Sequence, residues 1–253
     1  DIKERYEIEF KNVNFKYSVT AENYVLKDLN FKIKEGETLW IMGPIGSGKT
    51  SLINLIPRLY DVTEGQVTIG GVNVKDLKID ELRSKIKVAL QELILFAGDI
   101  QYNIKYGKSN ATIEEMKDAC EQACAWEFVS SLPKKLEAPV EQRGRNFSGG
   151  QKQRLCLARA IVGKPKILIL DDVTCALDMI TEKRVQQNLN KSLPKTTKII
   201  VSQRISSIIN ADKIIVLDKG TINGIGTHKQ LVKTNDIYRE IVESQMNTTG
   251  MEG

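Results

Sequence analysis

Residues 43–50 read Gly-Pro-Ile-Gly-Ser-Gly-Lys-Thr, a spacing suited to binding the phosphate groups of a nucleotide. The glycines allow backbone amides to approach phosphate oxygens closely, because they carry no Cβ. Lys49 is placed to reach the β- and γ-phosphates, and the Thr50 hydroxyl to bind Mg²⁺. A helix beginning near Lys49 would aim its positive end at the phosphates. We therefore expect a nucleotide and Mg²⁺ here, with a plain glycine-rich turn as the weaker alternative.

A second candidate element lies more than a hundred residues further along the chain. Residues 167–170 are four consecutive apolar residues, followed by Asp171 and Asp172. The apolar run predicts a short buried strand, and an aspartate at its tip can hold Mg²⁺ through water. Taken alone, a buried strand that simply ends in aspartate explains this segment equally well. Together with the phosphate-binding segment, the metal-holding interpretation is favoured.

The elements that must position these residues follow from the hydrophobic pattern. Apolar residues alternate in two segments and predict antiparallel strands at Tyr6–Phe15 and Val25–Ile33, joined by a loop at Ser18–Asn23. A short apolar run predicts a buried strand at Thr38–Met42, directly before the phosphate-binding segment. After it we expect a helix at 49–59, a hairpin at Gln66–Ile69 with Gly70-Gly71, and a buried strand at Ile86–Leu90.

The pattern becomes helical from about residue 92 to 147, with helical spacing at Ile113–Cys124 and Glu127–Leu132. We interpret this stretch as an inserted helical lobe. After Ser148 we expect a helix, and then a second α/β section with a strand at Lys166–Leu170, a helix at Thr181–Leu189, a strand at Lys198–Ser202 and a hairpin around Lys219-Gly220. His228, the only histidine in the chain, lies at the expected start of a surface helix.

Strands that alternate with helices predict an α/β fold with a mostly parallel sheet, whose ligand lies at the carboxyl ends of the strands. We expect one domain over residues 1–253: an α/β core with a β-subdomain at 1–91 and 159–246, a helical subdomain at 92–158, and a flexible, disordered tail at 247–253. No internal repeat is apparent.

Composition excludes several classes of protein. No run of about 18 apolar residues exists, so no segment of the sequence is expected to span a bilayer by itself. The formal charge of +5 is mild and scattered, and it does not predict a nucleic-acid partner. The four cysteines have no histidine nearby and form no Cys-x-x-Cys pair, which favours reduced thiols over disulfides or metal ligands. Because the chain opens with Asp1, we expect it to be a cytoplasmic piece of a longer polypeptide.

A third segment suggests a specific family. Phe147-Ser148-Gly149-Gly150-Gln151 follows the phosphate-binding segment by about a hundred residues, and it resembles the signature of ATP-binding cassette (ABC) domains. That resemblance implies a P-loop NTPase, RecA-like fold and ATP with Mg²⁺ as ligands. It assigns the signature residues to the γ-phosphate of an ATP held by an opposite protomer. It places ATP on Tyr17, Gly43, Pro44, Ile45, Gly46, Ser47, Gly48, Lys49, Thr50 and Ser51, with Tyr17 stacked on adenine; an ordinary strand tyrosine is the alternative reading there.

Further residues acquire roles from the same resemblance. Gln91 matches the glutamine that touches Mg²⁺ and the attacking water and senses the membrane domain, together with the apolar stretch at 93–96. Asp171 becomes a Mg²⁺ ligand with Thr50 and Gln91. Asp178 falls in the loop at the dimer interface. Residues 140–144 are similar to the segment by which exporter-type cassettes contact their transmembrane domains, although a solvated loop would explain their charges too.

At two positions the chain departs from the family pattern. Asp172 stands where the family carries glutamate, the general base, and Gln203 stands where it carries a histidine that contacts the γ-phosphate. Asp172 is one methylene shorter than glutamate, and a base misplaced by about 1 Å can lower a rate about 100-fold. Gln203 can donate a hydrogen bond but cannot become cationic. Both changes predict impaired hydrolysis at this chain's own site, whereas its signature is intact.

This combination resembles the degenerate half of heterodimeric multidrug-type ABC exporters. It implies a second ABC subunit, transmembrane domains on the full-length chain, and a place at the cytoplasmic face of the cell membrane. A homodimer with two slow sites is one alternative. A soluble cassette protein acting on ribosomes or DNA is another, although such proteins usually carry tandem cassettes or coiled-coil insertions. A nucleotide sensor without turnover is the third.

Overall fold

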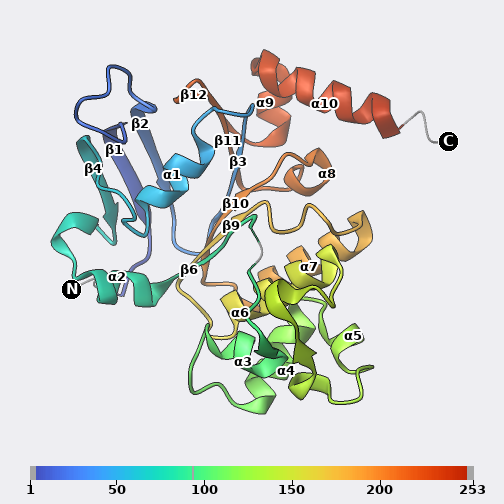
Figure 1. Ribbon diagram of the computed structural model, residues 1–253. Helices are drawn as coiled ribbons and strands as arrows, with labels where there is room; N and C mark the ends of the chain where they lie inside the picture. The colour runs from blue at the N-terminus through green and yellow to red at the C-terminus, as the bar shows by residue number, and fades with distance from the viewer. Residues whose placement is uncertain (1–3, 93, 250–253) are drawn as a thin grey trace. The chain divides into compact units, whose positions relative to one another are not determined.

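The computed structural model describes residues 4–92 and 94–249, and they divide into two compact units (Figure 1). The first unit combines the N-terminal part of the chain, up to Ser84, with the part that follows Thr197. The second unit comprises Lys85–Thr196. The first unit contains the phosphate-binding segment and Gln203, and the second contains Gln91, Asp171, Asp172 and the signature-like segment.

An antiparallel sheet in the first unit has the strand order β2-β1-β4-β5. It consists of β1 (Ile8–Phe15), β2 (Leu26–Ile33), β4 (Glu64–Ile69) and β5 (Val72–Asn73). β1 pairs with β2 as predicted, and Ile8 and Phe10 are buried before a register shift in β1, with Val13 and Phe15 buried after it. Gly70 and Gly71 join β4 to β5 with φ of 57° and 81°, a left-handed turn that glycine adopts without strain. Both predicted pairings are therefore confirmed.

A mixed sheet forms the other layer of this unit. β3 (Thr38–Met42) lies between β10 (Thr197–Val201) and β11 (Lys213–Asp218), parallel to both, while β12 (Thr221–Gly226) pairs antiparallel with β11. β3 is almost wholly buried, as its apolar run predicts, and β10 is wholly buried although it contains Thr197 and Lys198. The carboxyl ends of β3 and β10 lead into the phosphate-binding segment and Gln203 respectively. The parallel pairing thus brings these two distant segments to the same edge.

Helix α1 (Lys49–Leu55) begins at the predicted residue but ends four residues earlier than predicted. Pro57 has no backbone N–H to donate into the helix, and Ile56 already bonds to Ile53 in the tighter i−3 pattern. Next come the one-turn helix η1 (Val74–Asp76) and α2 (Ile79–Lys85). Only one residue of α2, Leu82, is buried, so its sequence carried little helical periodicity to detect.

Three helices close the first unit: α8 (Ile205–Ile208), α9 (His228–Thr234) and α10 (Asp236–Thr249), drawn in orange and red in Figure 1. His228 begins α9, as expected, and Thr227 caps the helix in a reciprocal capping box with Gln230. The disordered tail predicted at 247–253 is wrong for its first three residues, which continue α10. These residues extend an amphipathic helix anchored by Tyr238 and Val242. Residues 250–253 lie outside the described part of the chain.

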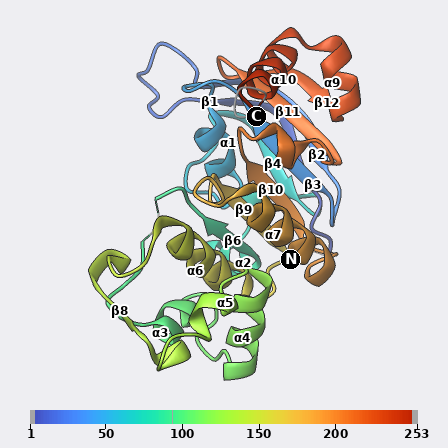
Figure 2. The ribbon, with the colours of Figure 1, turned by 90° about the vertical axis from the view of Figure 1, so that its right-hand side faces the viewer.

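The second unit contains the parallel pair β6 (Ile86–Ala89) and β9 (Ile167–Asp171). Its helices, seen from the side in Figure 2, are α3 (Ile100–Lys105), α4 (Ile113–Gln122), α5 (Trp126–Val129), α6 (Gly149–Ile161) and α7 (Met179–Ser192). The helical lobe predicted between β6 and β9 is therefore present. α5 is shorter and α7 longer than predicted, and Leu90, predicted to be in a buried strand, lies after β6 and is 47% exposed.

The interpretation of residues 92–147 as a helical lobe is incomplete in one respect, because the lobe also contains two short strands. β7 (Gly98–Asp99) pairs antiparallel with β8 (Pro139–Val140), and the one-turn helices η2 (Lys135–Glu137) and η3 (Gln142–Gly144) flank β8. A two-residue strand has too few positions to show alternation, so only the tertiary contact reveals it. No disulfide links the four cysteines, all of which lie in the described residues, and Cys120, Cys124 and Cys156 are buried. Within residues 4–92 and 94–249, no helix is both long and apolar enough to cross a bilayer.

Candidate nucleotide site

The phosphate-binding segment forms a loop between β3 and α1, and its glycines have three different roles. A Cβ on Gly43 would lie 2.0 Å from the Leu217 carbonyl oxygen, so only glycine fits this close approach. Gly48 has a φ of 102° and forms the N-cap of α1. Gly46 faces no heavy atom within 4 Å of an added Cβ, and Ile45 and Thr50 are exposed beside it. The loop therefore has open space beside Gly46, as a phosphate cradle needs.

Lys49 lies along this loop. Its Nζ donates to the carbonyl oxygens of Gly43 (2.6 Å) and Pro44 (2.9 Å) and lies 3.4 Å from Ser47 Oγ. The ammonium group is thus held at the mouth of the loop, where it can neutralise phosphate charge. The exposed Thr50 hydroxyl at the first turn of α1 is free of steric cover and suits a hard cation such as Mg²⁺. These residues fit a polyphosphate with Mg²⁺.

Tyr17 belongs to an aromatic cluster that follows β1. Its ring is 53% exposed and meets Phe15 and Tyr60 edge-on, with centroid distances of 4.8 and 5.0 Å. Its hydroxyl lies 2.5 Å from Ser51 Oγ on α1. Two residues predicted to bind the nucleotide, Tyr17 and Ser51, are therefore joined directly. The exposed ring face can stack on a planar base.

Gln203 follows β10 and reaches the phosphate-binding loop. Its Nε2 donates to the Gly43 carbonyl oxygen at 2.8 Å, the same oxygen that accepts from Lys49. The structure therefore places the Gln203 side chain on the phosphate-binding loop, and its contact with a γ-phosphate stays a prediction. The only histidine, His228, instead packs against Tyr238, with its Nδ1 2.7 Å from the phenol oxygen.

In the second unit, Asp171 and Asp172 follow one another at the end of β9. Asp171 is 8% exposed and is the last residue of the strand. Asp172 has a φ of 55°, a left-handed conformation that is uncommon for residues other than glycine. The chain then continues through residues 173–177 into α7.

The signature-like segment forms the N-terminus of α6. Ser148 Oγ accepts from the Gln151 amide (3.2 Å), and Gln151 Oε1 accepts from the Ser148 amide (2.9 Å), a complete capping box. Gly149 and Gly150 pack on the loop before α7, because added Cβ atoms would meet Ala176 and Leu177 at 3.3–3.6 Å. Ser148 and Gly149 are nevertheless exposed, so the positive end of α6 is accessible to an anion.

Asp178, predicted to lie at a dimer interface, caps α7. Its carboxylate accepts from the Thr181 amide (2.9 Å) and hydroxyl (2.7 Å), and these hydrogen bonds hold its pKa below the ordinary value. The carboxylate is therefore already engaged as a helix cap, which fixes the geometry of the loop at 175–178.

Gln153 is a residue that sequence reasoning missed. It is 3% exposed, its Oε1 accepts from the Ala176 amide (2.9 Å), and its Nε2 lies 3.1 Å from Cys175 Sγ. A glutamine on the buried face of an otherwise amphipathic helix was the available signal, because a buried amide needs partners. Gln153 connects the signature-like helix with the loop at 175–178.

Gln91 is exposed after β6, beside a groove of about 350 Å³. The groove is bordered by the exposed apolar residues Leu90, Ile94, Phe96 and Tyr106, and Arg159 on α6 donates to the Ile94 carbonyl (2.8 Å). Leu93, part of the apolar stretch predicted beside Gln91, lies outside the described residues.

The predicted exporter-type segment at 140–144 comprises the end of β8 and η3. Asn146 holds it, since its side chain accepts from the Glu141 amide (3.0 Å) and donates to the Pro139 carbonyl (2.9 Å). Arg143 has a φ of 58° and Gly144 packs on Leu95. The segment is thus a hydrogen-bonded turn, in which Glu141 and Arg143 are exposed.

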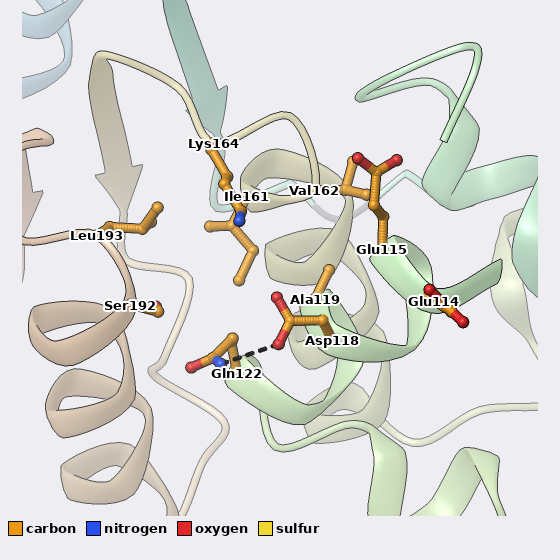
Figure 3. Close-up of a pocket in the computed structure, with 10 residues that line it drawn as sticks. All are labelled: Glu114, Glu115, Asp118, Ala119, Gln122, Ile161, Val162, Lys164, Ser192 and Leu193. Atoms are coloured by element: carbon orange, nitrogen blue, oxygen red, sulfur yellow. Dashed lines mark hydrogen bonds between the residues drawn. The ribbon is translucent and has the colours of Figure 1, made fainter. Parts of the chain in front are cut away.

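Another hollow in the second unit, of about 420 Å³, contains none of these residues (Figure 3). Acidic side chains of α4, including Asp118, face Lys164, Ser192 and Leu193, and Gln122 donates to Asp118 at 3.3 Å. Its carboxylates and lack of clustered cations make it unsuitable for phosphate groups.

Comparison with known proteins agrees with this geometry. A family model described as ABC transporter matches residues 26–175, which include the phosphate-binding loop, the signature-like segment, and Asp171 and Asp172. The chain belongs to the ABC transporter family. Its fold is that of a P-loop NTPase with an antiparallel β-subdomain and a helical insertion, and domains of this family bind ATP with Mg²⁺.

Individual ABC proteins are similar over almost the whole chain. It is 41% identical over 238 residues to YgaD of Bacillus subtilis, named as a multidrug export ATP-binding/permease protein, covering 94% of this chain and 41% of YgaD. It is 42% identical over 245 residues to Multidrug resistance protein 1 of Entamoeba histolytica, covering 96% and 19%. A bacterial Atm1-family ABC exporter solved with ATP bound superposes with a TM-score of 0.91 at 34% identity, covering 96% of this chain and 42% of that one. The chain thus spans less than half the length of these relatives.

Proposed function

We propose that this ABC domain binds Mg-ATP, dimerises head to tail with a second ABC subunit, and drives export of a substrate across a membrane. The observation that carries the proposal is the open phosphate-binding loop, with Lys49 and Gln203 both on the Gly43 carbonyl. The relatives named as multidrug export proteins and the solved exporter support the direction of transport. The domain then lies at the cytoplasmic face of the membrane, joined to transmembrane domains.

Each predicted residue has a task in this proposal. Lys49 and the loop amides hold the phosphates, and Tyr17 stacks on adenine. Thr50, Gln91 and Asp171 hold Mg²⁺, which neutralises charge on the phosphate oxygens. Asp172 stands at the position of the base that orients the attacking water, and Gln203 donates a hydrogen bond to the γ-phosphate.

The domain's own site is the weak one of a heterodimer. The side chain of Asp172 is one methylene shorter than that of the glutamate expected there. It also leaves the backbone at a residue with left-handed φ, which fixes the direction of its Cα–Cβ bond. Gln203 donates a hydrogen bond but transfers no proton. Its binding residues are intact, so ATP is held but turned over slowly. A partner with glutamate and histidine at these positions supplies the faster site.

The signature serves the opposite site. Ser148 and Gln151 complete the cap of α6, and Gly149 and Gly150 leave the end of the helix open to the γ-phosphate of the partner's ATP. Asp178 and the loop before it lie against the same helix end, which suits a shared dimer interface.

A transmembrane domain docks on the groove beside Gln91. Leu90, Ile94, Phe96, Tyr102 and Tyr106 are each between 42% and 53% exposed, an unusual number of large apolar side chains in one place. The turn at 140–144, held by Asn146, provides a second contact. Movement of Gln91 on ATP binding thus reaches the membrane domain.

The test is to measure ATP binding and hydrolysis on the same sample, with and without the partner subunit. We expect tight Mg-ATP binding with negligible turnover by the chain alone, and turnover that depends on Ser148 once the partner is added. Ser148→Ala removes the hydroxyl, and Ser130→Ala on the exposed end of α5 is the matched control. Brisk hydrolysis by the chain alone would favour a homodimer with two working sites, and no Mg-ATP binding would reject the proposal.

A further inference from the structure

The segment that carries Gln203 is held by a residue from the C-terminal helix. Gln245 on α10 donates through Nε2 to the Gln203 carbonyl and accepts through Oε1 from the Ile205 amide at 2.9 Å. One side-chain amide therefore bridges the backbone on both sides of Arg204. Because both hydrogen bonds come from one planar amide group, they restrain the position and the orientation of the backbone at residues 203–205 together.

The contact also completes the short helix α8. Arg204, its N-cap residue, makes no side-chain cap hydrogen bond to the helix, and Gln245 supplies an acceptor for the Ile205 amide. An N-terminal amide without an acceptor costs free energy when it is shielded from water. The start of α8, and with it the backbone of Gln203, is consequently held by α10 in addition to the local hydrogen bond from the Arg204 amide to Ser202 Oγ at 3.2 Å.

The other end of Gln203 reaches the phosphate-binding loop. Its Nε2 donates to the Gly43 carbonyl, which also accepts from Lys49, so both lone pairs of that oxygen are used. Contacts therefore run without a gap from Gln245 through Gln203 to Gly43 and Lys49. α10 is itself anchored by Tyr238, whose side chain is fully buried.

We infer that Gln245 is a positioning residue for Gln203. Through Gln245, helix α10 sets the contribution of the γ-phosphate to the affinity of this domain for ATP. The inference rests on the proposed function, which assigns Gln203 to the γ-phosphate. It follows that displacement of α10 lowers the affinity for ATP without removing any residue that contacts the nucleotide. The affinity for ADP, which has no γ-phosphate, is the same whether α10 is in place or displaced.

Equilibrium binding of Mg-ATP and Mg-ADP to this chain tests the inference. Gln245→Met keeps the length of the side chain but removes both hydrogen bonds, and Gln245→Glu keeps the acceptor and loses the donor. We expect each to weaken Mg-ATP binding about threefold to tenfold and to leave Mg-ADP binding unchanged. Glu243→Gln, exposed on the same helix, is the matched control. Equal weakening of ATP and ADP would mean a merely structural role and would overturn the inference.

A second series separates this inference from the proposed function. In a Gln203→Ala background, Gln245→Met should have no further effect on the preference for ATP, because the residue it positions is gone. If Gln203→Ala changes the preference but Gln245→Met does not, Gln245 is not the positioning residue. If Gln203→Ala itself changes nothing, the γ-phosphate role of Gln203 fails instead. Hydrogen exchange without nucleotide gives an independent reading: Gln245→Met should accelerate exchange at the Ile205 amide, and unchanged exchange contradicts the bridge.

Discussion

Gln153 on α6 accepts a hydrogen bond from the Ala176 amide at 2.9 Å, and so ties the signature helix to the loop that precedes α7. Both elements belong to the second unit, and both are proposed to face the partner subunit. Their relative position then depends on one buried amide, which sequence reasoning did not identify.

Replacing Gln153 should disturb both elements. Gln153→Leu leaves the Ala176 amide without its acceptor, and a shielded polar group without a partner costs about 1–3 kcal/mol. We expect a comparable fall in the free energy of unfolding, measured by urea denaturation, and a loss of the ATPase activity that depends on the partner. Gln153→Glu retains the acceptor and should recover most of the activity. Equal loss in the two variants would show that the bond to Ala176 is not what matters.

Lys49→Ala should abolish tight nucleotide binding. Its ammonium group is held on the Gly43 and Pro44 carbonyls, and charged hydrogen bonds of this kind contribute about 1.5–3 kcal/mol. The dissociation constant for Mg-ATP, measured by calorimetry, should rise about tenfold to 100-fold. Lys34→Ala, an exposed lysine outside the loop, is the control and should bind normally. Unaltered binding by Lys49→Ala would place the nucleotide elsewhere.

The contribution of Tyr17 to ATP binding can be measured separately from that of the phosphate groups. Tyr17→Ala removes the exposed ring, and base stacking on an aromatic side chain is worth about 1–3 kcal/mol. We expect weaker Mg-ATP binding but unchanged binding of inorganic tripolyphosphate, which has no base to stack. Tyr17→Phe keeps the ring and loses the contact with Ser51, so it should resemble the original chain. If Tyr17→Ala weakens both ligands alike, the ring supports the loop rather than adenine.

Replacing Asp172 and Gln203 by the residues of the family pattern should raise the rate of ATP hydrolysis. Asp172→Glu together with Gln203→His supplies a longer base and a group that can carry a proton, and we expect an increase of at least about tenfold in ATP hydrolysis. The measurement requires the properly dimerised protein with the partner's own site inactivated. Each single change should have a smaller effect than the pair. An unchanged rate in the double variant would argue against the roles assigned to both positions.

Alkaline pH should destabilise the domain through Tyr238. Burial raises the pKa of this phenol to about 12, whereas an unfolded tyrosine titrates near 10. The folded state therefore retains a proton that the unfolded state releases. Stability is complete below about pH 10 and falls as pH rises towards 12, by at most about 1.4 kcal/mol per pH unit from this residue.

Denaturation at increasing pH checks this slope, and Tyr238→Phe should flatten it although it loses the contact with His228. Phenolate absorbance offers a direct reading, because Tyr238 should be the last tyrosine to ionise before unfolding. An identical slope in the Phe variant would assign the alkaline transition to other groups, among them Cys120, whose pKa burial also raises to about 12.

The elements with a strong local pattern were predictable. Thr38–Met42 and residues 167–170 are unbroken apolar runs, and both are buried strands. The phosphate-binding loop was predictable because its glycines, Lys49 and Thr50 stand at a characteristic spacing in residues 43–50, whereas the close approach of Leu217 to Gly43 is a tertiary contact. Very short elements such as β7, α2 and α8 were not, because two to seven residues with few buried side chains carry little periodicity.

The sequence by itself determined the chemistry available to this protein: a phosphate cradle with Lys49 and Thr50, a carboxylate pair at 171–172, and a glutamine in place of the histidine at 203. These are statements about residue type and spacing, which local sterics and charge constrain. Only the tertiary structure decided which side chains fix the positions of these residues. The examples are the hydrogen bonds of Gln203 with Gly43, of Gln245 with Gln203 and of Gln153 with Ala176. Each of these contacts joins residues far apart along the chain or on separate elements, and no local pattern encodes the partner of a buried amide.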